Sequence, residues 1–563
     1  MLELLLNIVL ILLILMTLCY YLGRFINSTF IDVDINPAKI NKFIKIISSI
    51  ENMIFKFAKI DPLAQMSAKS YYGLLLLTNL LISVVGFFML YFQKKLPLHS
   101  TLIEDLSLSQ IFHTITSYIT NTDQMHFAPE TNLTFFSNYI TLPIIMLVSS
   151  ATAVSVGIMF IRAITKNQIG NFYRDYLLSF TRILLPICFL LSIIHCAIGL
   201  PNTFKESIDY TTLENVKQTL LLGPIAAIQP IITFGTNGGG VFNANAAHPL
   251  ANPTYLSNLI QIILMLAIPT ALIFTLGFSL KNLKQSIVIL AAIFGIIIVE
   301  IIISSILELR GNTYLNELSN NNAFPNWPGK ETRFGIIGSV IYSISATSTC
   351  GATNSSLDFY HPASIAFMLV QMLNGPLYGN MGVGPIYAIN YFLYTMIFIG
   401  FMLGKTPEIF GKKIEKNEII LSSLLLLIGP FLILVGTAIT IKLFPINSSV
   451  LADNLHHYTR IFYEYTSASG NNGSGLEGLM DNTTFSNIAL GLVMTIGWYG
   501  PIGIMMLLAS GLSNKHIATT SETAFKTDTI SFSFIYLIML MVLTLLVYLP
   551  FLILGPGIEA LIK

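Results

Sequence analysis

Long runs of hydrophobic residues, rather than alternating ones, dominate the pattern along this chain of 563 residues. A helix needs about 20 apolar residues to cross the hydrocarbon core of a bilayer. Ten runs reach or approach that length, and they cover residues 3–23, 71–92, 136–161, 183–200, 255–279, 285–307, 363–403, 418–443, 486–511 and 530–554. The pattern predicts an all-α polytopic membrane protein with about ten transmembrane helices.

The seventh run, 363–403, is too long for one simple crossing and contains two breaks. Asn374-Gly375-Pro376 forms the first, and residues 379–385, rich in glycine, form the second. Backbone groups freed by Gly and Pro at membrane depth are tolerated where protein or a wet cavity satisfies them. We therefore expect a broken helix bordering a permeation path, with Gly379, Gly382 and Gly384 as gate or pathway residues, although a kink absorbed by packing fits the same pattern.

Four further segments are semi-apolar and too short to span: Leu108–Thr120, Thr219–Gly235, Gly335–Thr347 and Tyr458–Thr466. Such lengths suit re-entrant helices. Each leads directly into a polar stretch. These stretches contain Thr120, Asn121 and Thr122; Thr236, Asn237, Gly238 and Gly239; Thr349, Cys350 and Gly351; and Asn471, Asn472 and Gly473.

Aligning Thr122, Gly238, Gly351 and Gly473 gives separations of 116, 113 and 122 residues. A near-constant period indicates an internal repeat. Each unit reads span, re-entrant helix, polar loop, span, and four units are expected around a pseudo-fourfold pore. The expected divisions are an extra span at 1–25, repeats at 70–165, 180–282, 285–405 and 418–515, and a last span at 528–556.

Four such loops indicate an ion selectivity filter. A dehydrated cation needs oxygen ligands on all sides, and rings of backbone carbonyls supply them in potassium channels. Glycine reaches positive φ without steric cost, which would explain Gly238, Gly239, Gly351 and Gly473. A helix that ends near the axis also aims its partly negative C-terminus at the cation. Any one loop alone would pass for an ordinary turn.

Composition and charge agree with this interpretation. Hydrophobic residues make up 54% of the chain and charged residues 10%, against about 25% charged in soluble domains. The net charge of +1 argues against a nucleic-acid partner. The first run has Glu3 instead of a basic start and is followed by Arg24, so we expect a retained span rather than a cleaved signal. If both termini are extracytoplasmic, 19 of the 29 basic residues lie in inner loops. Because basic residues favour the cytoplasmic side, we expect this orientation.

Few residues offer other chemistry. The four cysteines show no CxxC pair, and Cys350 is expected to pack behind the filter carbonyls. None of the nine histidines is predicted as a ligand. Glu300 lies inside an apolar span, where an ionisable group marks a candidate pathway residue.

The sequence resembles the potassium-binding A subunits of bacterial Kdp potassium-transporting ATPases over nearly its whole length. The resemblance rests on residues 235–240 followed by Phe242-Asn243-Ala244-Asn245-Ala246-Ala247-His248-Pro249, on residues 349–352 and 471–474, and on residues 404–408 with 411–413. Two features depart from the family pattern: Gln124 and Met125 follow Asp123 in the first loop, and Gly375-Pro376 replaces an acidic residue.

The resemblance implies a K⁺-binding, non-catalytic subunit in a bacterial plasma (inner) membrane. Such a subunit takes K⁺ from outside and passes it sideways to the B subunit of the complex, a P-type ATPase, with a C subunit and a small single-span F subunit alongside. The chain has no DKTG phosphorylation motif and no Walker A loop, and no covalent cofactor is expected. A self-sufficient K⁺ or Na⁺ channel-like protein of the same superfamily is the alternative, and a neighbouring gene for a P-type ATPase would separate the two.

Overall fold

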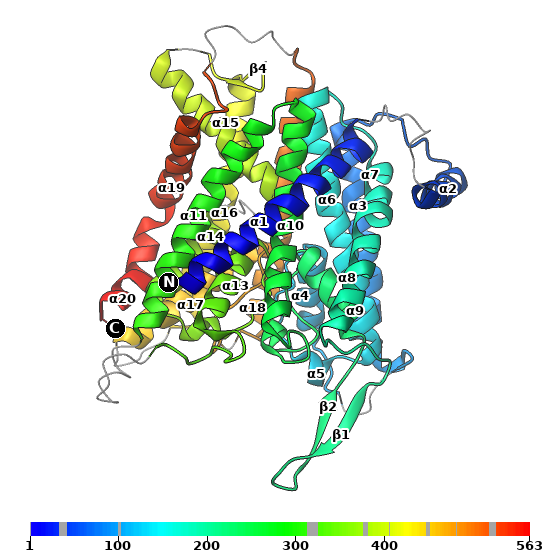
Figure 1. Ribbon diagram of the computed structural model, residues 1–563, viewed down its shortest axis with the longest axis vertical. Coiled ribbons are helices and arrows are strands. Elements are labelled where there is room, and N and C mark those ends of the chain that lie inside the picture. Colours follow the sequence, from blue (N-terminus) through cyan, green and yellow to red (C-terminus); the bar gives the residue numbers. More distant parts are fainter. Residues whose placement is uncertain are drawn as a thin grey trace.

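The computed structural model describes residues 2–32, 42–98, 103–311, 325–374, 381–404, 406–445, 451–479, 481–516 and 525–562, and it is almost entirely helical (Figure 1). Within these ranges ten helical stretches are long and apolar enough to cross a membrane. They are α1 with η1 (Leu2–Ile31), α3 (Ala68–Tyr91), η4 with α6 (Ser137–Lys166), α7 with η5 and α8 (Phe172–Ala197), α10 (Tyr255–Leu280), α11 (Leu283–Arg310), α15 (Val383–Leu403), α16 (Lys416–Leu443), α18 (Thr484–Ser513), and α19 with η8 and α20 (Ile530–Ile562). The prediction of an all-α membrane protein with ten spans is confirmed.

Burial separates central from peripheral spans. In the spans that contain α6 and α10, 89% of the residues in the most apolar 18-residue stretch are buried. In the spans that contain α3, α16 and α19, only 22% of such residues are buried. A helix that is hydrophobic all round and exposed on most of its surface is stable where lipid is the solvent. The peripheral helices therefore form the lipid-facing layer, and α6 and α10 lie in the interior.

The first span shows how this layer is attached. Its buried residues Leu4, Ile8, Ile11, Leu15 and Cys19 follow a helical spacing of three or four, so they form one stripe. The stripe packs along α10, which α1 crosses diagonally (Figure 1). A Cβ at Gly23 would lie 2.6 Å from the carbonyl oxygen of Ala271, so glycine allows the two backbones to approach closely.

Four shorter helices lie between the spans: α4 (Leu108–Ile119), α9 (Ile225–Phe234), α13 (Gly335–Thr349) and α17 (Leu451–Ser469). They overlap the four predicted re-entrant segments, with two corrections. Helix α17 is longer than the predicted Tyr458–Thr466 at both ends, and the second segment starts later than predicted. Residues 219–221 belong to strand β2 (Lys217–Leu221), which pairs with β1 (Ser207–Thr211) in an exposed antiparallel hairpin, so the second short helix starts only at Ile225.

The long seventh run is divided, as expected, into α14 (Pro362–Leu373) and α15 (Val383–Leu403). The remaining elements are α2 (Lys42–Phe57) and α5 (Pro129–Asn132), together with the small hairpin β3 (Glu408–Ile409) and β4 (Lys412–Lys413). In Figure 1 the β1–β2 hairpin projects from one end of the molecule and β4 lies at the other. Both chain termini lie in the half that holds α13, α17 and the β1–β2 hairpin (Figure 1).

Candidate functional site

The four short helices each end on one of four buried polar loops. We call these loop 1 (residues 120–124), loop 2 (235–240), loop 3 (350–354) and loop 4 (470–475). Nearly all of their residues are buried, including the Thr and Asn side chains. The helix C-termini, which carry partial negative charge, therefore end at the same buried polar centre.

Three of the four helices end in the same way. Asn121, Thr236 and Asn471 are left-handed, with φ of 56°, 45° and 52°. The next amide in each loop donates to a carbonyl five residues back, with Thr122 N bonded to Ser117 O (2.9 Å), Asn237 N to Ile232 O (3.0 Å) and Asn472 N to Ser467 O (2.9 Å). These are Schellman ends, in which one left-handed residue lets the last carbonyls of the helix be satisfied.

The matching helix ends shift the alignment of loop 1, which the sequence pattern had based on Thr122, by one residue. Two residues after each left-handed cap a second left-handed residue follows: Asp123 (φ 52°), Gly238 (φ 87°) and Gly473 (φ 98°). Asp123, and not Thr122, therefore corresponds to the two glycines. Asp is one of the few residues with a Cβ that tolerates this conformation, which explains how loop 1 does without a glycine.

Loop 3 departs from the other three. Helix α13 continues to Thr349, and Cys350 follows in an extended conformation (φ −140°) with its amide bonded to Ala346 O at 2.8 Å. Gly351 does not have a positive φ, so the expectation that backbone angle selects glycine there is wrong. Glycine is required at this position because a Cβ would collide with the backbone of Gly473 and Ser474.

Backbone contacts of this kind close the four loops into a ring. A Cβ on Gly239 would lie 2.9 Å from Asp123 O, and one on Gly238 would lie 2.6 Å from Gly351 N. A Cβ on Gly351 would meet the backbone of Gly473, and one on Gly473 would meet the carbonyl of Thr122. Loops 1, 2, 3 and 4 thus touch in order, backbone to backbone, and loop 4 returns to loop 1.

Asparagine side chains tie the ring together. Asn121 Nδ2 donates to Thr236 O at 2.8 Å, which joins loops 1 and 2. Asn471 Nδ2 donates to Thr122 Oγ1 at 3.0 Å, which joins loops 4 and 1. Asn472 Nδ2 donates to the carbonyl oxygen of Ala346 at 3.0 Å, which joins loop 4 to the end of α13. Buried amides with their donors satisfied in this way fix a single loop geometry.

Two serines of α6, to which no loop motif pointed, support the ring. Ser149 Oγ lies 2.9 Å from Asn121 Oδ1 and 3.1 Å from Asn237 Oδ1, so one hydroxyl contacts loops 1 and 2. Ser150 Oγ donates to Gly235 O at 3.0 Å and accepts from Asn237 Nδ2 at 3.0 Å. A run of hydroxyl residues inside an otherwise apolar span, here 149–155, was the signal for them.

Two other predicted site residues, Thr349 and Cys350, are fully buried. The Thr349 hydroxyl donates to Ser345 O within its own helix at 3.1 Å, so it is directed back along α13. Burial raises the pKa of the Cys350 thiol to about 11, so the sulfur is neutral at physiological pH. Thr120 likewise bonds Thr116 O at 2.7 Å in α4.

One side of the ring opens into a small acidic cavity of about 150 Å³, whose lining includes Gly351 and Gly473. Asp123 and Glu464 line it together with Glu477 and Asp481. Both carboxylate oxygens of Asp123 are buried without a hydrogen-bond partner among the described residues, and burial raises the pKa of this carboxyl well above its usual range. An unpaired buried carboxyl is costly, and a cation in the cavity would supply the missing partner.

The broken helix adjoins the ring. The amide of Met381 donates to Thr236 Oγ1 at 3.1 Å, which links the segment before α15 to loop 2. A Cβ on Gly382 would collide with Ala153 O in α6, so this glycine permits close backbone packing. Gly384 is buried in the first turn of α15, and Gly379 lies outside the described residues.

Glu300 has a partner that the sequence did not reveal. It is buried in α11 and accepts a hydrogen bond from the side-chain amide of Gln371 in α14, the helix that ends at the break. Its second oxygen, Oε1, makes no hydrogen bond among the described residues. Glu300 therefore lies beside the broken helix but is not part of the ring.

Chemically, the ring brings backbone carbonyls, hydroxyls and the negative ends of four helices together. Such an environment suits a dehydrated cation, which needs oxygen ligands in place of its water.

Comparisons of the sequence with known proteins show the family of this chain, and a comparison of structures shows a related fold. The sequence matches the profile of the Potassium-transporting ATPase A subunit family over residues 9–561. A potassium-transporting ATPase potassium-binding subunit from Nostoc sp. is 38% identical over 514 residues, which cover 91% of this chain and 91% of the relative. A protein of the same name from Geobacillus kaustophilus is 35% identical over 553 residues, 98% of each chain. The potassium transporter TrkH from Vibrio parahaemolyticus, at 12% identity and a TM-score of 0.50, matches 72% of this chain and 78% of its own, which shows a shared fold.

Proposed function

Because this chain belongs to the Potassium-transporting ATPase A subunit family, we propose that it is the potassium-binding subunit of an ATP-driven K⁺ uptake complex. Its curated relatives carry that name over nearly their whole length. The chain is a multi-pass membrane protein with K⁺ as its transported ligand, and the ATP-hydrolysing activity belongs to a partner subunit.

The closed ring of four loops is the observation that carries the proposal. The filter consists of Thr120, Asn121, Thr122, Thr236, Asn237, Gly238, Gly239, Thr349, Cys350, Gly351, Asn471, Asn472 and Gly473. Backbone carbonyls that line the ring replace the water of a K⁺ ion, and the Asn and Thr hydrogen bonds hold those carbonyls in place. Asp123 takes the place of a glycine and puts a carboxyl group beside the ring, and a nearby cation would favour the ionised form of this group.

The filter is the product of four repeats, each with a span, a short helix, a loop and a second span. We divide the chain as the sequence period suggests, at 70–165, 180–282, 285–405 and 418–515, with single spans at 1–25 and 528–556. The helices α4, α9, α13 and α17 fall one in each unit, and the Schellman ends of three of them support the division.

Beyond the filter the ion passes the broken helix on its way to the partner. The contact of Met381 with Thr236 links the break to loop 2, which supports a pathway along Gly382 and Gly384. Glu300 is the acidic residue of that pathway, since it lies beside α14 and one of its carboxylate oxygens makes no hydrogen bond among the described residues. Gly379 is assigned to the same pathway on the glycine pattern alone.

The partner is the B subunit of the complex, a P-type ATPase. A C subunit and a small single-span F subunit complete the assembly in the bacterial plasma membrane. Both termini are extracytoplasmic, since 19 of 29 basic residues then lie in inner loops.

The experiment that tests the proposal is K⁺ uptake by cells that lack other K⁺ systems, with this chain expressed alone or with its candidate ATPase. Uptake that requires both proteins supports the assignment as a subunit. Uptake by the chain alone indicates a self-sufficient channel.

A further inference from the structure

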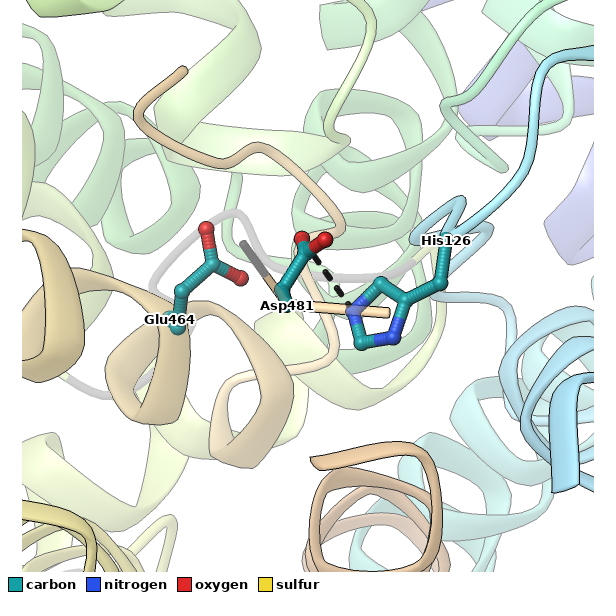
Figure 2. A group of neighbouring side chains, drawn as sticks. All are labelled: His126, Glu464 and Asp481. Atoms are coloured by element: carbon teal, nitrogen blue, oxygen red, sulfur yellow. Dashed lines mark ion pairs between the residues drawn. The ribbon is translucent and has the colours of Figure 1, made fainter. Parts of the chain in front are cut away.

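Three side chains from separate parts of the chain meet beside the acidic cavity, and two of them, Glu464 and Asp481, line it (Figure 2). His126 follows loop 1, Glu464 lies on α17, and Asp481 precedes α18. One ligand atom from each lies within 4.8 Å of the other two. The His126 and Glu464 side chains are buried, whereas the Asp481 side chain is 30% exposed at the cavity.

Hydrogen bonds fix which nitrogen of His126 faces the cluster. Its Nδ1 lies 2.7 Å from Asn487 Oδ1. The amide nitrogen of Asn487 bonds Ser109 Oγ and Asn482 Oδ1, each at 3.2 Å, so Asn487 presents its oxygen to the imidazole. Nδ1 of His126 therefore carries a proton, and in the neutral imidazole Nε2 keeps a lone pair directed at the cluster.

The Nε2 atom makes no hydrogen bond among the described residues. It faces Asp481 Oδ2 at 3.5 Å, along the dashed line in Figure 2. With a neutral imidazole, two lone pairs face each other at this distance, and a metal ion between them would turn that repulsion into coordination. A tetrahedral zinc ion with bonds of about 2.1 Å holds its ligand atoms about 3.4 Å apart, which agrees with the observed separation.

The second acid of the cluster, Glu464, forms no ion pair with a basic residue among the described residues. Glu464 accepts a hydrogen bond from Gln124 Nε2, while Gln124 Oε1 has no partner among the described residues. One imidazole nitrogen and two carboxylates are a donor set for Zn²⁺ and related transition metals, whereas Mg²⁺ and Ca²⁺ favour oxygen alone.

We propose that His126, Glu464 and Asp481 bind a transition-metal ion of the Zn²⁺ class, with water or Gln124 Oε1 in the fourth position. The same cavity is lined by Gly351 and Gly473 of the ring, so the metal lies at the mouth of the ring. One consequence rests on the proposed function: a bound divalent ion repels K⁺ and obstructs the access of K⁺ to the ring.

Metal binding is measured first, without any K⁺ flux. The purified complex is titrated with Co²⁺, whose visible absorption reports tetrahedral coordination, and with Zn²⁺ by calorimetry. We expect one ion per chain and displacement of Co²⁺ by Zn²⁺. His126→Gln and Asp481→Asn should each weaken binding by about tenfold or more, since loss even of an outer partner of a metal ligand costs about 10- to 100-fold.

Two variants serve as matched controls. Glu477→Gln removes a negative charge from the same cavity without removing a ligand atom of the cluster, and His457→Gln removes a histidine elsewhere on α17. Both should bind Zn²⁺ within about twofold of the unchanged protein. The proposal is overturned if His126→Gln, with K⁺ binding intact, retains full Zn²⁺ affinity, or if Glu477→Gln weakens binding as much as Asp481→Asn does.

K⁺ binding is then measured with and without Zn²⁺. Zn²⁺ should raise the apparent Kd for K⁺ in the unchanged protein and leave it unchanged in His126→Gln. If Zn²⁺ binds but leaves the apparent Kd for K⁺ unchanged, the metal site stands, but its location at the K⁺ entrance is rejected. If neither the unchanged protein nor any variant binds K⁺, the proposed function is contradicted, whereas the metal titration still tests the metal site.

Discussion

Gly473 in loop 4 and Thr122 in loop 1, far apart in the sequence, touch through their backbones alone. Gly473 has φ of 98°, and a Cβ there would collide with the carbonyl oxygen of Thr122. The contact closes the ring, so the geometry of the last loop sets the position of a carbonyl in the first.

The first prediction concerns this contact. Gly473→Ala adds a Cβ in a left-handed conformation, which alone costs about 1–2 kcal/mol. We expect K⁺ affinity to fall about tenfold or more, because about 1.4 kcal/mol corresponds to a factor of ten. K⁺ binding by calorimetry measures the effect. Gly73→Ala in α3 is the control, since no atom lies within 4 Å of its Cβ, and equal losses in the two variants would contradict the assignment of Gly473 to the filter.

A second prediction tests the charge of loop 1. Asp123→Asn keeps a residue that tolerates positive φ and removes the carboxylate. Apparent K⁺ affinity should fall a few-fold, and the loss should shrink as ionic strength rises, because salt screens the attraction of cations to the cavity. Uptake kinetics at low and high ionic strength, with choline as the added cation, give the comparison. A salt-independent loss would mean that Asp123 acts through loop geometry and not through charge.

The third prediction concerns coupling to the partner. The isolated chain should hydrolyse no ATP, whereas its complex with the ATPase should show K⁺-stimulated hydrolysis. Binding linkage is reciprocal, so Gly473→Ala should move the K⁺ dependence of hydrolysis to higher concentration by a factor similar to its loss of K⁺ affinity. Phosphate release against K⁺ is the measurement. An unchanged K⁺ dependence in a variant with weakened K⁺ binding would reject the coupling.

A pH prediction follows from the N-terminal half of α17, where His456 lies. Burial alone would lower the pKa of His456, but hydrogen bonds to Asp358 and Glu559 outweigh it and raise the pKa. A group with a raised folded pKa stabilises the protein below its unfolded pKa, about 6.5, and this stabilisation is lost as pH rises through the folded value. Arg460, which pairs with Asp358, stays charged throughout.

We therefore expect the thermal unfolding midpoint to fall as pH rises above about 6.5, and His456→Gln to reduce this dependence. The neighbouring His457→Gln is the control, because burial lowers the pKa of His457 instead. Equal pH profiles for His456→Gln and the unchanged protein would show that this ion-pair cluster does not contribute.

The last prediction concerns orientation. Single cysteines at Ile562 and at Leu213 in the hairpin should react with an impermeant reagent added outside, whereas one at Lys413 should react only after the membrane is opened. All three positions are exposed. The exposed Cys196 is replaced by Ser beforehand. Labelling of positions 562 and 413 from the same side would reject the proposed topology.

The sequence by itself determined the ten spans, the four short helices and the break in the seventh run. Run length and glycine content are local properties of the sequence. A long apolar run forms a helix in the bilayer because its backbone groups must be hydrogen-bonded within the segment, and Gly and Pro interrupt that bonding. It also placed the four loops, because their Thr, Asn and Gly residues follow each short helix at a near-constant period.

The tertiary structure decided which residues within the loops correspond and why. Gly351 is required by the approach of Gly473, a contact between residues more than a hundred positions apart, and not by its own backbone angle. Asp123 is the counterpart of Gly238 because the turn after α4 matches the turn after α9, which no residue identity reveals. Ser149, Gln371 and the cluster around His126 were likewise invisible, since a hydrogen bond or a ligand set between distant segments exists only once packing has brought them together.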